Sequence, residues 1–228
     1  MIISVIYRFA LDKEHQSTFA KVAAYIDENM DYIPLTFLLG FFVSVIFGRW
    51  KDIFSHIGFI DRAAFFVTNY IHANDEEEFI VIKRNILRYL CLTQVMVLRD
   101  ISVPVRKRFP NMQSVMDAGF LLPNELKSME KVITEYPKYW MPINWAISLA
   151  IKCRKEGKIL ADVFLNTTCV EIASFQEHLR ILLNYDWVPV PLAYPQVVFL
   201  AVRVYFILTL ISRQYIIAED DPHYSKVS

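Results

Sequence analysis

Glycine and cysteine are scarce in this sequence, with five glycines and three cysteines in 228 residues. No glycine stands in a G-x-G-x-x-G or G-x-x-x-x-G-K-[ST] pattern, so a nucleotide-binding loop is not expected. The cysteines, Cys91, Cys153 and Cys169, are odd in number, widely spaced and set in apolar stretches. They indicate neither a disulfide framework nor a zinc site, and they fit a reducing, cytosolic environment.

Clustered histidines and net charge are also missing. The five histidines are solitary, without an H-E-x-x-H pair, and there is no G-x-S-x-G nucleophile turn, so we predict that the protein is not an enzyme. The 24 basic residues are balanced by 24 acidic ones. A neutral chain has no overall attraction to polyanions, and nucleic acid is therefore not an expected partner.

Apolar residues are abundant in this sequence. Hydrophobic residues make up 55% of the chain and aromatic residues 14%, while charged residues still reach 21%, and the mean hydropathy is +0.31. This mixture predicts a membrane part joined to a water-exposed part.

The first long apolar run extends from Tyr32 to Gly48 and stops at Arg49-Trp50-Lys51. Asp31 precedes the run and Pro34 stands in its first turn, as is typical of a helix start. Cations beside an aromatic residue are typical of a membrane–water interface. We therefore predict a membrane helix over residues 31–49, at the short end of what can span a bilayer.

A second run follows three prolines and predicts another membrane segment over residues 189–217. Between Gln196 and Ile217 only Arg203 and Arg213 are charged. We expect Arg203 to face protein or an interface, because a cation is costly in lipid. Residues 1–9 are apolar but lack the features of a signal peptide, and we interpret them as the remnant of a first membrane helix.

Ile33, Phe37 and Phe41 recur at i, i+4 and i+8 in the first run. This spacing predicts one bulky apolar face on a helix. Two interpretations remain open: a stripe that faces lipid or a protein core, and a hydrophobic constriction in a pore.

An acidic cluster at Asn74-Asp75-Glu76-Glu77-Glu78 could suggest calcium, but no D-x-D-x-D-G loop is present. A helix start explains it better, with Asn74 as N-cap and Glu77 in the capping-box position. The apolar stripe that follows predicts one long helix to Val105. Its cations are expected on a solvated edge: Lys83, Arg84, Arg88 and Arg99.

An ordered series of motifs over nearly the whole chain resembles the bestrophins. The series is Ile33-Pro34, Phe37, Gly40-Phe41, Arg49-Trp50, Asp61-Arg62, Arg88-Tyr89, Leu98-Arg99, Arg108-Phe109-Pro110, Ala118-Gly119-Phe120, Tyr185-Asp186-Trp187, Gln196-Val197-Val198 and Arg213-Gln214. The resemblance implies an all-α membrane protein in a single domain over 1–228, whose transmembrane helices continue into a cytosolic helical bundle. Residues 50–186 would form that cytosolic region.

The resemblance also implies a function. The chain would be a subunit of a chloride channel, a multi-pass protein of the plasma membrane, assembled as a homopentamer around one pore or as a hetero-oligomer with related subunits. Ile33, Phe37 and Phe41 would line an apolar pore neck, and Val163 a cytosolic aperture.

Two features differ from the family pattern. Most of the first membrane helix and the acidic calcium clasp are expected to be missing, because Glu219, Asp220 and Asp221 follow the last apolar run too closely to match the clasp. Calcium regulation is thus expected from the family but has no site here. A non-conducting subunit that assembles only with full-length relatives is the alternative function, and a soluble helical enzyme or adaptor is a third.

Overall fold

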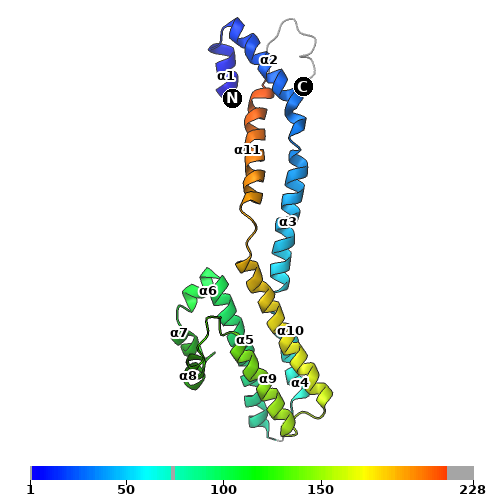
Figure 1. Cartoon of the computed structure of the whole chain (residues 1–228), viewed down its shortest axis with the longest axis vertical. Coiled ribbons are helices and arrows are strands. Elements are labelled where there is room, and N and C mark those ends of the chain that lie inside the picture. Colours follow the sequence, from blue (N-terminus) through cyan, green and yellow to red (C-terminus); the bar gives the residue numbers. More distant parts are fainter. Residues whose placement is uncertain (1, 73–74, 215–228) are drawn as a thin grey trace. The chain divides into compact units, whose positions relative to one another are not determined.

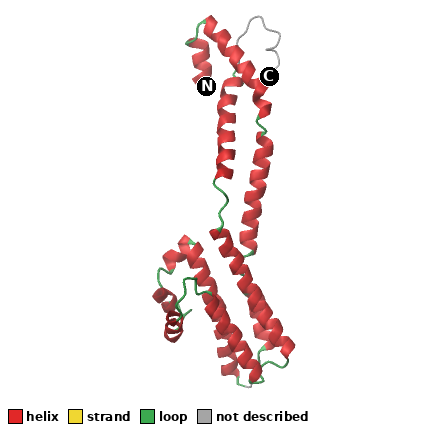
Figure 2. Cartoon of the chain, in the orientation of Figure 1, coloured by secondary structure: helices red, strands yellow, loops and turns green. Residues whose placement is uncertain are grey.

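The computed structural model describes residues 2–72 and 75–214, and every regular element within those ranges is helical (Figure 2). The all-α class predicted from the sequence is therefore confirmed. The elements are α1 (Ile2–Phe9), α2 (Lys13–Asn29), the 3-10 helix η1 (Met30–Tyr32), α3 (Leu35–Ser55), α4 (Asp61–Tyr70), α5 (Glu76–Ile101), α6 (Val103–Arg108), α7 (Met112–Asp117), α8 (Pro123–Lys131), α9 (Trp140–Lys155), α10 (Asp162–Trp187) and α11 (Ala193–Ser212).

The helices form two compact units. The terminal unit combines residues up to Arg49 with those from Val190 onward, and the helical unit is the contiguous segment Trp50–Pro189. The predicted division into a membrane part and a cytosolic part remains a prediction, because no bilayer is present.

The helical unit is built on α5, α9, α10 and α4, which pack side by side (Figure 1). The apolar stripe predicted for α5 faces this core, with Ile86, Leu90 and Val97 fully buried. Between α3 and α4, Gly58 adopts a φ of +81°, and an added Cβ would lie 2.6 Å from Cδ2 of Leu179. Only glycine fits this turn against α10.

The start and end of α5 differ from the sequence prediction. Asn74 lies outside the described residues, and the side chain of Asp75 caps the helix by accepting a hydrogen bond from the amide of Glu78. The helix ends at Ile101 rather than Val105, because Pro104 has no amide to donate and its ring excludes a continuous helix. Ser102 is extended, and α6 begins directly after it.

Two cations of α5 are also more enclosed than expected. Lys83 is 8% exposed, donates to the carbonyl of Thr68 and lies over the ring of Phe79. Arg88 holds Glu125 of α8 in a two-point contact, with Nη1–Oε2 at 2.7 Å and Nη2–Oε1 at 2.6 Å. The expectation of a solvated edge is wrong for both residues, because partners distant in sequence cover them.

The terminal unit exposes most of its apolar surface. α3 has no buried residue, and α11 buries only Val198 and Ser212. α11 packs on α2, and the ring of Phe42 in α3 contacts those of Tyr194 and Phe199 in α11.

Within the described residues, α11 is by itself long and apolar enough to cross a membrane, and only 11% of its apolar stretch is buried. α3 is long enough, with 21 residues, but it meets the combined criterion of length and composition only together with α2 and η1, across a bend of 43°. α3 begins at Leu35, later than the start of the membrane helix predicted over residues 31–49.

Candidate functional site

Two of the predicted pore-neck residues form a pair on α3. The rings of Phe37 and Phe41 meet edge to face, with their centroids 4.6 Å apart. Both are exposed, Phe37 by 63% and Phe41 by 57%. An i, i+4 spacing places the two side chains one above the other on a helix, and the structure leaves this aromatic face uncovered within the chain.

Ile33 does not belong to the same helix. It follows η1 in an extended conformation, with φ −100° and ψ 95°, and is half-buried. The physical reason is Pro34, since the helical region is sterically disfavoured for the residue before a proline. The expected three-residue helical stripe is thus reduced to Phe37 and Phe41, preceded by Ile33 in the incoming segment.

The face that carries the two phenylalanines continues with small residues. At about 100° per residue, Ser44 and Gly48 lie within about 20–60° of Phe37 and Phe41 around α3. A Cβ added at Gly48 would meet no atom within 4 Å. Helical spacing in the sequence already places Ser44 and Gly48 on this face, but a search for bulky apolar residues alone misses them.

Val163, the predicted aperture residue, is the second residue of α10 in the helical unit and is 71% exposed. Leu160 just before the helix is exposed as well. Large apolar side chains at a water-exposed helix start are unusual for a core element. Val163 is therefore not buried by the described residues.

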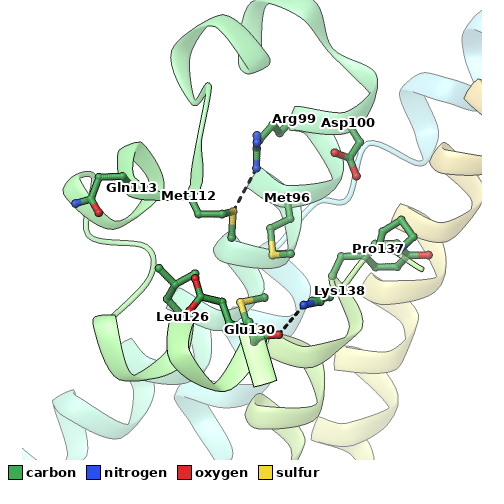
Figure 3. Close-up of a pocket in the computed structure, with 11 residues that line it drawn as sticks. Met96, Arg99, Asp100, Met112, Gln113, Leu126, Glu130, Pro137 and Lys138 are labelled. Carbon is green, nitrogen blue, oxygen red and sulfur yellow. Dashed lines mark hydrogen bonds between the residues drawn. The ribbon is translucent and has the colours of Figure 1, made fainter. Parts of the chain in front are cut away.

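The helical unit also contains a cavity that the sequence did not predict. It has a volume of about 530 Å³ and lies where the end of α5, α7, α8 and the segment before α9 meet (Figure 3). Methionines from three of these elements contribute to its wall: Met96, Met112 and Met129. No local pattern could reveal this cavity, because its wall is assembled from separate segments.

Charged side chains line the same cavity. Arg99 donates from Nη2 to the carbonyl of Pro110 at 3.1 Å and from Nη1 to the sulfur of Met112 at 3.2 Å. Lys138 donates to the carbonyl of Met129 at 2.7 Å. Burial raises the pKa of the Asp100 carboxyl, against the opposing effect of Arg99 and Arg106 and with a contribution from Asp186.

No group of three or more His, Cys, Asp or Glu side chains within residues 2–72 and 75–214 is arranged to hold a metal ion. The acidic residues Glu219, Asp220 and Asp221, which the sequence did not match to the calcium clasp, lie outside the described residues.

Comparison with known proteins gives one family. Residues 1–228 match the family model described as "Bestrophin, RFP-TM, chloride channel". Bestrophin homolog 15 of Caenorhabditis elegans is 46% identical over 220 residues, covering 95% of this chain and 42% of the relative. Bestrophin homolog 22 of the same organism is 46% identical over 223 residues, covering 97% and 44%. The chain thus spans less than half the length of these relatives.

Proposed function

Because the chain belongs to the bestrophin family of chloride channels, we propose that it is a subunit of an anion channel that conducts chloride across the plasma membrane. One structural observation carries the proposal beyond the family: the apolar helix α3 has no buried residue and presents Phe37 and Phe41 as an exposed pair. A helix of this kind in a soluble protein would bury that face in its own core. Lipid and neighbouring subunits are the partners that suit it.

In the proposed channel, Ile33, Phe37 and Phe41 of several subunits line a narrow neck. A ring of apolar side chains opposes ion passage by excluding water when it is narrow. When the ring widens, the positive edges of the phenylalanine rings favour anions over cations. The small residues Ser44 and Gly48 on the same face would let the pore widen beyond the neck.

Val163 is proposed to form a second constriction at the cytosolic side. Its exposure supports this role, since a ring of β-branched side chains forms an aperture only if they are uncovered within each subunit. The pore requires an oligomer, for which a homopentamer or a hetero-oligomer with related subunits is proposed.

The proposed anion conduction is tested by measuring chloride flux into liposomes reconstituted with the 228-residue chain. The flux is measured both with and without micromolar calcium. We expect chloride-selective flux. Cation selectivity would contradict the anion assignment. Absence of flux from folded, membrane-inserted protein that co-purifies with a full-length relative would favour the non-conducting subunit.

Substitutions of the aromatic pair test the neck. We expect Phe37→Ala and Phe41→Ala each to raise resting chloride flux several-fold, because a smaller ring excludes water less effectively. Ile46→Ala is the matched control: this residue is 41% exposed on the same helix, but it lies about 140–180° around the axis from the two phenylalanines. Unchanged flux in both phenylalanine variants would show that these residues do not form the gate.

A further inference from the structure

The cavity between α5, α7, α8 and the segment before α9 is suited to a ligand. Its volume of about 530 Å³ lies within the range of small-molecule sites in proteins. It belongs entirely to the helical unit and includes none of the predicted pore residues. We propose that this cavity binds an amphipathic carboxylate, with the carboxylate on Arg99 and Lys138 and an aromatic or alkyl body against the methionines.

The apolar half of the site comes from Met96, Met112, Met129 and Leu126, which line one continuous cavity (Figure 3). Methionine side chains are flexible and polarisable, and their sulfur atoms contact aromatic ring edges favourably. Met129 is held in the second hydrophobic core of the unit, together with Phe109 and Leu121. The apolar wall is therefore anchored from behind while its surface can adapt to a ligand.

The polar half comes from two cations with spare donors. A guanidinium has five N–H donors and an ammonium three, and the described contacts of Arg99 use two while that of Lys138 uses one. The acceptors are carbonyl oxygens and a thioether sulfur, and neither cation forms an ion pair with a carboxylate in the part of the chain described. Donors and positive charge thus remain for an anionic ligand.

The fold also fixes the position of Arg99. Its carbonyl accepts a hydrogen bond from Nε of Arg106, and its side chain reaches the carbonyl of Pro110 beyond α6. The break in the helix at Ser102 allows this arrangement, since it turns α6 back toward the end of α5. Arg99 is therefore oriented before a ligand arrives, which lowers the entropy cost of binding.

Two acidic side chains also line the cavity, Asp100 and Glu130. Asp100 directly follows Arg99, and we expect it to influence the specificity. An ionised Asp100 carboxylate would repel an anionic ligand bound to Arg99. Removing this charge should strengthen carboxylate binding. A ligand held by an ammonium group would show the opposite response.

Three probes with one carbon skeleton test the proposal: 4-phenylbutyrate, 4-phenylbutan-1-ol and 4-phenylbutylammonium. Each is titrated by calorimetry into the full chain in lipid nanodiscs, with empty nanodiscs as reference. We expect the carboxylate to bind about tenfold more tightly than either analogue, as is typical of a charge-assisted hydrogen bond. Equal binding of all three, tighter binding of the ammonium probe, or no binding would overturn the proposal.

Substitutions locate the binding. Arg99→Gln should weaken 4-phenylbutyrate binding by about tenfold and Lys138→Gln by several-fold, while Asp100→Asn should strengthen it by several-fold. Lys155→Gln, which removes an exposed cation of α9 away from the cavity, should change nothing. Leu126→Trp should abolish binding by filling the cavity, with circular dichroism melts checking each fold.

A gain of affinity in Asp100→Asn cannot arise from misfolding, so this variant remains decisive even if Arg99→Gln unfolds. Affinity that is unchanged or reduced in Asp100→Asn would contradict the proposed orientation of the ligand. Because binding is measured without ion flux, the result is independent of whether the chain conducts chloride.

Discussion

At the scale of single residues, the contact between Arg88 and Glu125 has the largest predicted effect on stability. Both side chains are enclosed, with 16% and 9% exposure, and join by two hydrogen bonds. Glu125 also accepts the amide of Leu122 at the start of α8, and Arg88 donates to the carbonyl of Phe120. The pair therefore connects α5 to the start of α8 and to the segment before it.

We predict that Glu125→Gln destabilises the helical unit by about 3–5 kcal/mol, because Arg88 would keep a buried charge without its partner. Thermal or chemical unfolding followed by circular dichroism measures the loss. Glu177→Gln, which removes the exposed partner of Arg180 in α10, is the control and should leave the melting temperature unchanged. Equal stability of Glu125→Gln and the unsubstituted protein would contradict the prediction.

The same pair sets a pH dependence. Burial alone would raise the pKa of Glu125, but the hydrogen bonds from Arg88 and Leu122 outweigh it and lower the pKa from its usual value of about 4.5. A lowered pKa contributes stability that is present above the usual value and is lost as the pH falls through the lowered one. The stability difference between the unsubstituted protein and Glu125→Gln should therefore shrink below about pH 4.5.

At the scale of elements, α3 combines an aromatic pair with two small residues on one face. Gly48 lies about 20° around the axis from both phenylalanines and faces open space within the chain. We predict that Gly48→Leu adds a second apolar constriction and reduces chloride flux roughly fivefold or more. Flux into liposomes measures the change.

Gly40→Leu is the matched control for this variant. It makes the same substitution at a glycine that also has open space around it, but it lies about 60–100° away from the phenylalanines around the helix axis. Equal flux in the two leucine variants would show that the face of Phe37 and Phe41 does not line the pore.

Elements also show what the sequence could predict. Helical spacing alone predicted that Phe37 and Phe41 share one face and that α5 carries an apolar stripe, but not that the two phenylalanines are exposed. The extended conformation of Ile33 was not predicted, although Pro34 disfavours a helical residue before it. The two-point contact of Arg88 and Glu125 joins residues 37 apart in sequence, and no local pattern indicates such a partner.

At the scale of the whole molecule, the structure confirms the all-α class, and the ordered motifs correctly identified the bestrophin family. The cavity bounded by α5, α7 and α8 was not predictable, because it exists only after α6 has turned back at Ser102. Its methionines read as ordinary apolar residues in the sequence. Long-range packing, rather than local propensity, decides such features.

Assembly is the prediction at this scale. The apolar face of α3 and Val163 are exposed in the single chain, and a ring of subunits would cover them. We predict that chemical cross-linking of the purified chain in nanodiscs yields a ladder that ends at five subunits. A ladder that stops at one or two subunits would contradict the proposed pentamer.

The division of the chain has a consequence for its synthesis on the ribosome. α2 packs on α11, yet the contiguous unit Trp50–Pro189 lies between them in sequence. The unit Trp50–Pro189 takes about 7–28 s to translate at 5–20 residues per second. During that interval α2 and α3 lack their partner α11, whereas the helices of the contiguous unit are already available to pack on one another.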